Sequence, residues 1–549
     1  MRLSPVVLAL LPGLAASSAY AAVYQVQELP EVSTTRSQYG AAINDNGDVV
    51  GSGSLIYNFP VDVSRLNFED ADLTARLSAE AIEQIKLGNV TAASLAQLLS
   101  YLESKSTNFS VQRYSDVLAL NLSTGAQVKI REQSAVPTNK EYLYDINSSG
   151  NAIALATTTF TLQSFTPEAT ETTPSPETVE LWLPEPGYMK SYVVNGNSVT
   201  PLPIPFEELG GGFSFASKIS ESNYIAGSGS VSMPTATQEA VNTTCTGKAS
   251  PLSLCYYNLA TTSYVERALV WKMNDTGQIS APVQYGFLGP AIAETSDLTY
   301  VSRALSVNDD AVAVGYSTYV SEERQIRTSH ATVFAEGEVS AIVDPLEWDS
   351  SSANDINNEN IIVGNANKRM NGIARNRMFI FDYNTKTVTY PNGFFSTSGT
   401  IPSAINENNL IVGAAEVIPD DSTTRRQVAF LYNLEDQTMT DLNTLLPCGV
   451  NFNLVEAKDI NNNNEILANA VFSVEQRDAK GEVVKDSAGN PVLENVVRPV
   501  KLTPVPNGTI ENCNAPEEVT YERKGGTSGW LTLLLLPLVM LRLSLIHIS

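Results

Sequence analysis

The feature that most constrains this chain is a short motif that recurs seven times along it. Each copy has an apolar residue followed by Asn or Ser, a polar turn and an apolar run rich in Val and Ile, as in AINDNGDVVG, which ends at Gly51. The Asn or Ser marks each copy, at Asn44, Asn147, Ser220, Asn308, Asn357, Asn406 and Asn461. The shortest spacing between markers is 49 residues, so the repeating unit has that length and the longer spacings contain insertions.

Each copy predicts two strands joined by a tight turn, because Asn, Asp and Gly accept a positive φ while Val and Ile favour the pleated strand. A second, alternating pattern follows after a variable gap, as in ALVWKMNDTGQIS at 268–280 and MFIFDYNTKTVTY at 378–390, and it predicts a hairpin. One unit therefore has four strands, which is the content of a propeller blade.

The predicted fold is all-β: a seven-bladed β-propeller over residues 22–510, with a two-helix insertion in the first blade, followed by a spacer at 511–524. After the hairpin of the seventh marker the sequence contains one further clear strand pattern, RPVKLTP at 498–504. A complete blade needs one more, so the last blade lacks its outer strand. The segment VYQVQELP at 23–30 is expected to supply that strand and to close the ring, which leaves no open sheet edge. The alternative architecture is a row of tandem β-sandwiches.

The insertions share one place in the repeat, between the second and third strands of a blade. In the first blade, residues 68–104 have helical spacing of apolar residues and predict two helices. The second insertion contains a Thr-, Pro- and Glu-rich stretch at 166–178, expected to be a flexible loop; the third holds a loop between Cys245 and Cys255; the seventh spans 473–497. Because this connection opens on the same face of every blade, the insertions should gather on one face, where a partner would bind.

The charge balance and the few histidines exclude several classes of function. With 34 Lys and Arg against 59 Asp and Glu, the net charge is −25, which repels nucleic acid and anionic headgroups. His330 is the one histidine of the body, at a strand end, and no Ser-His-Asp set accompanies it. The turn at 44–48 is oxygen-rich like a calcium loop, yet no bidentate Glu follows at a fixed offset. No catalytic, cofactor or metal residue is therefore assigned, and calcium stays the one alternative cofactor.

Residues 1–21 have the order of a secretory signal peptide: Arg2, an apolar stretch, and small residues before the expected cleavage after Ala21 or Ala22. The chain is thus expected to be exported through the inner membrane.

Export places the four cysteines in an oxidising compartment, where they predict two disulfides. Three connectivities are possible. Cys245 with Cys255 and Cys448 with Cys513 is the preferred one, because the first two share a short loop and the other two flank the final repeat.

The C-terminal stretch 525–542 begins with Gly525 and Gly526, continues as an apolar run long enough for a short membrane span, and ends at Arg542. It resembles a GlyGly-CTERM sorting signal. The resemblance implies that the tail holds the chain in the membrane until a rhomboid-type sorting protease, rhombosortase, cuts near the glycines, and that the protein reaches the cell surface through the type II secretion machinery. Residues 543–549 continue beyond the basic residue and are expected to be a non-native extension.

The repeat INxxNxIVG, followed by strands such as VAFLYN at 428–433, is similar to the HAF repeats of bacterial extracellular proteins. The layout from signal to tail resembles the gammaproteobacterial domain-of-unknown-function family 3466, which implies compartment and architecture but no activity. We therefore expect a surface-displayed propeller that binds a protein or glycan without catalysis. The alternatives are an extracellular carboxylate-based glycan hydrolase or lyase, and a structural envelope component.

Overall fold

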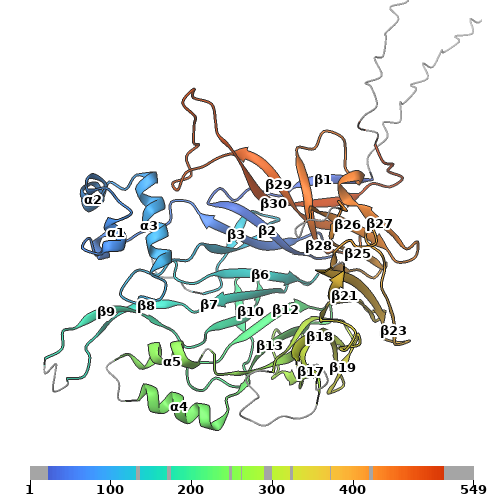
Figure 1. Cartoon of the computed structure of the whole chain (residues 1–549), viewed down its shortest axis with the longest axis horizontal. Helices are drawn as coiled ribbons and strands as arrows, with labels where there is room; N and C mark the ends of the chain where they lie inside the picture. The colour runs from blue at the N-terminus through green and yellow to red at the C-terminus, as the bar shows by residue number, and fades with distance from the viewer. Residues whose placement is uncertain are drawn as a thin grey trace, which may run out of the picture. The chain divides into compact units, whose positions relative to one another are not determined.

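The computed structural model describes residues 23–131, 136–169, 175–246, 250–260, 262–289, 300–321, 326–370, 372–419, 425–511 and 513. Seven four-stranded antiparallel sheets are arranged in a ring, each in contact with the next (Figure 1). The first strand of every sheet is innermost and touches the first strands of its neighbours. The prediction of a seven-bladed β-propeller is confirmed, and tandem sandwiches are not what the chain forms.

The strands of the blades follow the order of the repeats. Blade 1 is β2 (Thr35–Ile43), β3 (Val49–Ile56), β4 (Val117–Asn121) and β5 (Ala126–Val128); blade 2 is β6 (Glu141–Ile146), β7 (Ala152–Thr157), β10 (Met189–Asn195) and β11 (Ser198–Pro201); blade 3 is β12 (Ser214–Ile219), β13 (Tyr224–Ser232), β14 (Val265–Lys272) and β15 (Val283–Gln284); blade 4 is β16 (Ser302–Val307), β17 (Ala313–Ser321), β18 (Ile326–Ala335) and β19 (Glu338–Ala341). Blade 5 is β20 (Ser350–Ile356), β21 (Ile361–Met370), β22 (Ile373–Asp382) and β23 (Thr387–Thr389); blade 6 is β24 (Thr400–Ile405), β25 (Leu410–Glu416), β26 (Gln427–Asn433) and β27 (Thr438–Asp441); blade 7 is β28 (Phe452–Ile460), β29 (Ile466–Glu475), β30 (Leu493–Pro504) and β1.

The ring is closed by the N-terminal strand. β1 (Tyr24–Glu28) pairs antiparallel with β30, with Tyr24 opposite Pro504 and Glu28 opposite Val500. It thereby becomes the outer strand of blade 7, while β2 of the same N-terminal segment packs on β28 and β30. Both ends of the repeat array are thus held in one blade, as the sequence predicted.

The marker residues form hydrogen bonds from blade to blade around the ring. The side-chain amide of Asn44 donates to the carbonyl oxygen of Asn147 at 3.0 Å, and its Oδ1 accepts the N–H of Asp48 in its own turn at 2.8 Å. The same inter-blade bond joins Asn147 to Ser220, Asn308 to Asn357, Asn357 to Asn406, Asn406 to Asn461 and Asn461 to Asn44. An amide side chain can accept in its own turn and donate to the next blade at the same time, which suits Asn to this position; Ser220, the one exception, accepts the N–H of Tyr224 in its own turn at 3.3 Å.

The glycine that ends most copies is required by a close approach of two strands. Every inner strand carries a β-bulge just before its marker, between Gly40 and Ala42 in β2 and at the matching place in the other six. A Cβ on Gly51 would lie 2.0 Å from the carbonyl oxygen of Tyr39, so a side chain there would force the pair apart. Equivalent contacts of 2.0–2.2 Å exist at Gly227, Gly315, Gly364 and Gly413. Five blades thus combine the bulge with a glycine, whereas blades 2 and 7 have the bulge beside Ala154 and Ala468.

The insertion of blade 1 is helical, but the first of its two predicted helices is divided. α1 (Ala71–Thr74) ends before Ser78, whose hydroxyl accepts the N–H of Ala81 and begins α2 (Ala79–Lys86). A 3-10 turn, η1 (Val63–Arg65), precedes α1, and α3 (Ala92–Ser104) forms the second helix as predicted.

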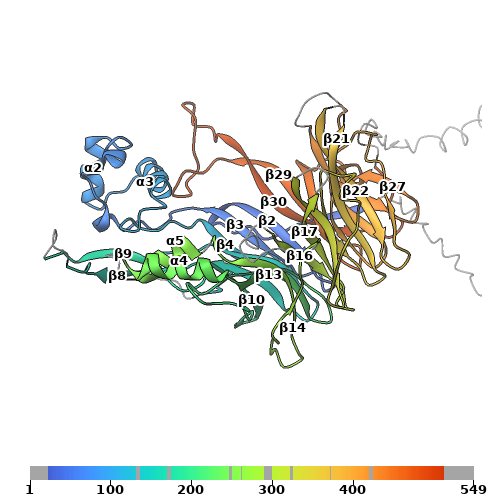
Figure 2. The same cartoon turned by 60° about the horizontal axis from the view of Figure 1, so that its bottom comes forward.

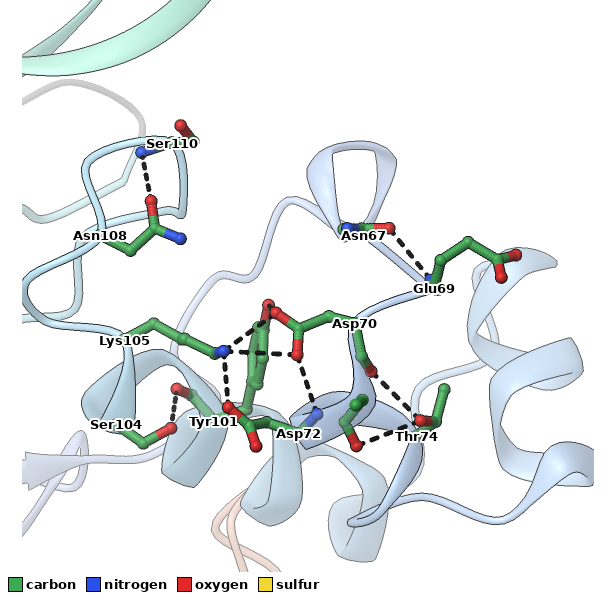
Figure 3. Close-up of polar contacts among 11 residues, drawn as sticks. Asn67, Glu69, Asp70, Asp72, Thr74, Tyr101, Ser104, Lys105, Asn108 and Ser110 are labelled. Carbon is green, nitrogen blue, oxygen red and sulfur yellow. Dashed lines mark hydrogen bonds and ion pairs between the residues drawn. The ribbon is translucent and has the colours of Figure 1, made fainter.

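The helices α1 and α3 are joined by a polar cluster at their adjacent ends. Lys105 lies 3.0 Å from a carboxylate oxygen of Asp70 and 2.6 Å from Asp72, and the hydroxyl of Tyr101 donates to Asp70 at 3.1 Å (Figure 3). These bonds fix the insertion as a folded unit rather than a loose loop.

The second and third insertions also contain regular structure. In blade 2, β8 (Phe160–Phe165) and β9 (Val179–Pro184) form a hairpin around the Thr- and Pro-rich stretch. In blade 3 the predicted loop between Cys245 and Cys255 is wrong: these cysteines lie in two helices, α4 (Thr235–Cys245) and α5 (Leu252–Ala260). Their disulfide, with a Cα–Cα distance of 5.6 Å, joins the helices.

Cys448 and Cys513 are also disulfide-bonded, so no cysteine of the chain is free. The remaining element is a 3-10 turn, η3 (Leu442–Leu445), after β27. Among the residues that the structure describes, no helix is both long and apolar enough to cross a membrane. The expected signal peptide with Ala21 and Ala22, and the expected sorting tail with Gly525, Gly526 and Arg542, lie outside the described residues.

Candidate functional site

The insertions lie on one face of the ring and pack on one another. Phe109 of the first insertion and Phe160 of the second contact the ring of Tyr257 from the third, at centroid distances of 6.1 and 5.4 Å. The N–H of Trp182 in β9 donates to the carbonyl oxygen of Phe109 at 2.8 Å. Figures 1 and 2 show α1–α5 and the β8–β9 hairpin together at one end of the propeller. The predicted clustering on a single face is therefore present.

The seventh insertion continues this structure across the closure of the ring. The N–H of Asn58, at the start of the first insertion, donates to the carbonyl oxygen of Ala479 at 2.7 Å, and Gly481 lies against the ring of Tyr57. The insertions of blades 7, 1, 2 and 3 thus form a continuous structure, which we call the insertion wall.

A cavity of about 530 Å³ opens at the centre of this face, lined by residues from all seven blades. Every inner strand runs from the insertion face toward its marker turn, so residues three to five positions before the markers line the insertion side of the centre. Aromatic side chains contributed by blades 1 and 2 are Tyr39, Tyr142 and Tyr144. Glu456 and Lys458 of blade 7 lie in the same lining and form an ion pair of 3.0 Å.

The floor of the central cavity is a layer of charged side chains two positions before the markers. Asp145, Asp355 and Asp459 each accept the N–H of an isoleucine in the next blade, at 2.7, 2.9 and 2.9 Å. Lys218 places its ammonium 3.5 Å from Asp355 and 3.7 Å from Asp459. These three carboxylates and one ammonium come from blades 2, 3, 5 and 7, and through the isoleucine N–H groups they join six of the blades.

Burial and the neighbouring charges shift the pKa values of the side chains in this layer. Removal from water raises the pKa of Asp145 to about 7 and also raises the pKa of Asp459. Burial alone would lower the pKa of Lys218, but Asp355, Asp459 and Asp145 hold it above its ordinary value. A carboxyl that titrates near neutrality could exchange a proton with a bound ligand. Its oxygen is, however, engaged by the backbone of blade 3, so the layer also serves as a structural plug.

The opposite face holds a smaller hollow of about 130 Å³ inside the ring of marker residues. Here the turn at 44–48 is closed by its own hydrogen bonds, because Oδ1 of Asn44 accepts the N–H groups of Asn46 and Asp48. Within the described ranges, no group of three or more His, Cys, Asp or Glu side chains could hold a metal ion.

A second cavity, of about 460 Å³, lies within the insertion wall between the end of β9 and α5. Its lining includes Tyr188, Tyr256, Tyr257 and Tyr264. The hydroxyl of Tyr264 donates to the carbonyl oxygen of Leu209 at 3.0 Å. Glu185, Lys190 and Glu207 also line this cavity, so both cavities combine tyrosines with charged side chains.

The family model for proteins of unknown function DUF3466 matches residues 2–543. The chain belongs to the DUF3466 family. None of the curated proteins compared with it matches.

Two solved structures similar to this DUF3466 chain are of the polysaccharide lyase PL25 ulvan lyase. One, bound to -[GlcA(1-4)Rha3S]-, is 11% identical, with 67% of this chain and 77% of that chain covered and a TM-score of 0.21. The other is 10% identical, with 85% of each chain covered and a TM-score of 0.23. At these TM-scores the similarity carries no inference about activity.

The DUF3466 chain places its one body histidine away from both cavities. His330 in β18 is fully buried; its Nε2 lies 2.7 Å from the hydroxyl of Thr328, and the ring packs edge-on against Tyr319 at 5.9 Å. The residue packs between blades 4 and 5, where Ser351 lies 3.4 Å from its Nδ1.

Reasoning from the sequence missed the residues that line the centre. The sequence does contain an indication of these residues. The positions two residues before the seven markers include charged side chains, where a buried strand would normally have apolar ones. These positions are Ala42, Asp145, Lys218, Ser306, Asp355, Ala404 and Asp459.

Proposed function

We propose that this DUF3466 chain is an exported, surface-displayed binding protein that contacts a protein or glycan partner with its insertion face and performs no chemistry. The observation that carries the proposal is the insertion wall: four consecutive blades contribute insertions that pack on one another and frame tyrosine-lined cavities. Tyrosine offers a large apolar face and a hydroxyl at little cost in conformational entropy, which suits recognition surfaces.

The engagement of the central carboxylates supports binding over catalysis. Each of Asp145, Asp355 and Asp459 accepts a backbone N–H from a neighbouring blade, and Lys218 lies between two of them. A general acid or base must reach its substrate within hydrogen-bond distance. One oxygen of each of these carboxylates is therefore committed to a bond that connects two blades.

The experiment that tests the proposal blocks one face at a time. Because no cysteine is free, Ser164→Cys on the exposed β8 and Glu435→Cys on the exposed β26–β27 turn accept a bulky maleimide polymer at a single position each. Labelled Ser164→Cys should lose binding to envelope fractions and to glycan arrays, whereas labelled Glu435→Cys should keep it. Equal loss in both, or no binding by the unlabelled protein, contradicts the proposal.

Export and sorting are part of the same proposal. The signal-like residues 1–21 and the tail at 525–542 support passage through the inner membrane, type II secretion and processing by a rhomboid-type protease, and the disulfides are compatible with that route. Mass spectrometry of the protein from the cell surface should give an N-terminus at residue 22 or 23 and a C-terminus near Gly525. A retained N-terminal segment or an uncut tail contradicts it.

One observation favours a second candidate, a carboxylate-based glycan hydrolase or lyase. Asp145, with its pKa raised to about 7 by burial, and Asp459 both line the central cavity and could act as acid and base. Release of reducing or unsaturated ends from a polysaccharide by the purified protein, abolished in Asp145→Asn, would establish this alternative.

A further inference from the structure

The central cavity of the insertion face has a distinctive arrangement of tyrosines that the bulged inner strands create. In β6 the bulge between Leu143 and Asp145 makes Tyr144 an extra residue that the register of β7 skips. The rings of Tyr142 and Tyr144 consequently lie nearly parallel, at a centroid distance of 5.9 Å and an interplanar angle of 24°. Phe215 of the next blade packs edge-on against Tyr144 at 5.4 Å and fixes its orientation. The bulge thus produces an aromatic surface at the wall of the cavity.

The hydroxyl groups of this surface are available to a ligand. Within the part of the chain that the structure describes, the hydroxyls of Tyr39, Tyr142 and Tyr144 make no hydrogen bond to protein. A half-buried tyrosine hydroxyl normally has a partner, because desolvating it without one costs free energy. The half-buried hydroxyls of Tyr142 and Tyr144, with the exposed one of Tyr39, lie beside aromatic faces. They match the chemistry of a sugar, which presents C–H groups on the faces of its ring and hydroxyls around its edge.

The charges around the cavity favour an uncharged ligand. Lys458 pairs with Glu456 at 3.0 Å, and Lys218 lies between Asp355 and Asp459, so both lysines of the lining are neutralised by carboxylates. A sulfated or uronic acid chain would find no uncompensated cation there, and the net charge of −25 would repel it at longer range. The paired charges still offer donors and acceptors to neutral hydroxyl groups.

The size of the cavity agrees with this ligand class. Its volume of about 530 Å³ lies within the range of roughly 300–1,000 Å³ that is typical of small-ligand sites. Residues from all seven blades line it, so a ligand there would be held by the whole ring rather than by one loop.

We infer that the central cavity of the insertion face binds a short segment of a neutral glycan, stacked on Tyr142 and Tyr144. This inference rests on the proposed binding function and specifies its ligand and its position. Tyr39, which is 40% exposed at the cavity entrance, supplies a third aromatic contact.

The test is titration calorimetry of the full mature protein with neutral tetrasaccharides (cellotetraose, maltotetraose and chitotetraose) and with acidic tetragalacturonate. At least one neutral probe should bind, and tetragalacturonate should bind at least tenfold more weakly. Tyr39→Ala and Tyr144→Ala should each lower the affinity for the neutral probe about tenfold, and Tyr144→Phe should lower it about threefold. Tyr383→Ala, after β22 and beside the marker turn of blade 5, lies away from the insertion face; it is the matched control and should stay within twofold.

Because 40% of Tyr39 is exposed, its variant is informative even if Tyr144→Ala fails to fold. Preference for the acidic probe, or unchanged affinity in Tyr39→Ala and Tyr144→Phe, overturns the inference. If the protein binds envelope fractions through the insertion face but none of the neutral probes, the inference fails while the proposed function stands. If it binds neither, both fail.

Discussion

The side-chain amide of Asn461 donates a hydrogen bond of 2.9 Å to the backbone carbonyl of Asn44, a residue 417 positions away in the sequence. The bond connects the last repeat to the first and continues the inter-blade bonds that the other marker asparagines make. A second contact closes the ring as well: β1, from the N-terminus, pairs with β30 and forms the outer strand of blade 7. Closure therefore has an inner contact at the marker ring and an outer one at the sheet edge.

Asn461→Asp tests the inner contact with almost no change in shape. The carboxylate keeps the acceptor for the N–H groups of its own turn but removes the donor to Asn44 and to the Glu465 carboxylate. A buried carbonyl loses that partner, and two carboxylates then face each other. We expect a loss of about 1–3 kcal/mol in the free energy of unfolding, measured by denaturant titration. Asn453→Asp at an exposed position of β28 is the control and should change the free energy by less than about 0.5 kcal/mol. Equal effects at both positions would contradict the double role of the marker.

Gly315→Ala tests the close approach at the bulge. An added Cβ would lie 2.0 Å from the carbonyl oxygen of Arg303, so β16 and β17 must separate. We expect a destabilisation of about 1–3 kcal/mol, seen as a lower midpoint of thermal or chemical unfolding. The natural alanine at the same place in blade 2 gives the comparison: Ala154→Gly should lower stability by no more than about 1 kcal/mol. A neutral Gly315→Ala would show that the strands adjust without cost.

The blade number and the closure could be predicted because turn chemistry and strand alternation are local properties, repeated at each marker. The helices α4 and α5 could not, since the Thr-rich sequence 235–245 has weak helix propensity, and the disulfide and packing on Tyr264 stabilise both helices. The central site was also missed. Lys218 of blade 3 and Asp355 of blade 5 meet only once the ring forms, and the bulge that makes Tyr144 an extra residue leaves no mark in a single sequence.

Ala311 has a left-handed backbone conformation, at a turn position where the other repeats have Gly or Asn. Its φ is +63°, whereas the equivalent turn positions hold Gly47, Gly150, Asn360 and others with the same sign of φ. Ala311→Gly removes the steric cost of the left-handed region, which is about 1–2 kcal/mol, and adds about 0.5–1 kcal/mol of unfolded-state entropy. We expect a net gain of up to about 1 kcal/mol in the free energy of unfolding. Ala313→Gly, in the buried strand that follows, should instead destabilise.

The protonation of Asp145 should make the stability of the propeller depend on pH. Burial raises the pKa of this carboxyl from 3.8 to about 7 in the folded protein, so between about pH 4 and pH 7 the folded chain retains a proton that the unfolded chain releases. The stabilisation that Asp145 contributes is therefore complete below its unfolded pKa and is lost as the pH rises through about 7. Each pKa unit corresponds to about 1.4 kcal/mol.

Asp145→Asn removes this titration while keeping an oxygen to accept the N–H of Ile219. The fall in unfolding free energy between pH 5 and pH 8, measured by urea titration at each pH, should become smaller by about 1–3 kcal/mol. Asp459, whose pKa burial also raises, retains part of the dependence in the variant. Asp275→Asn on an exposed turn is the surface control and should leave the slope unchanged. If Asp145→Asn keeps the full slope, the buried carboxyl is not the proton-binding group, and the central layer is better described as a fixed array of ion pairs around Lys218.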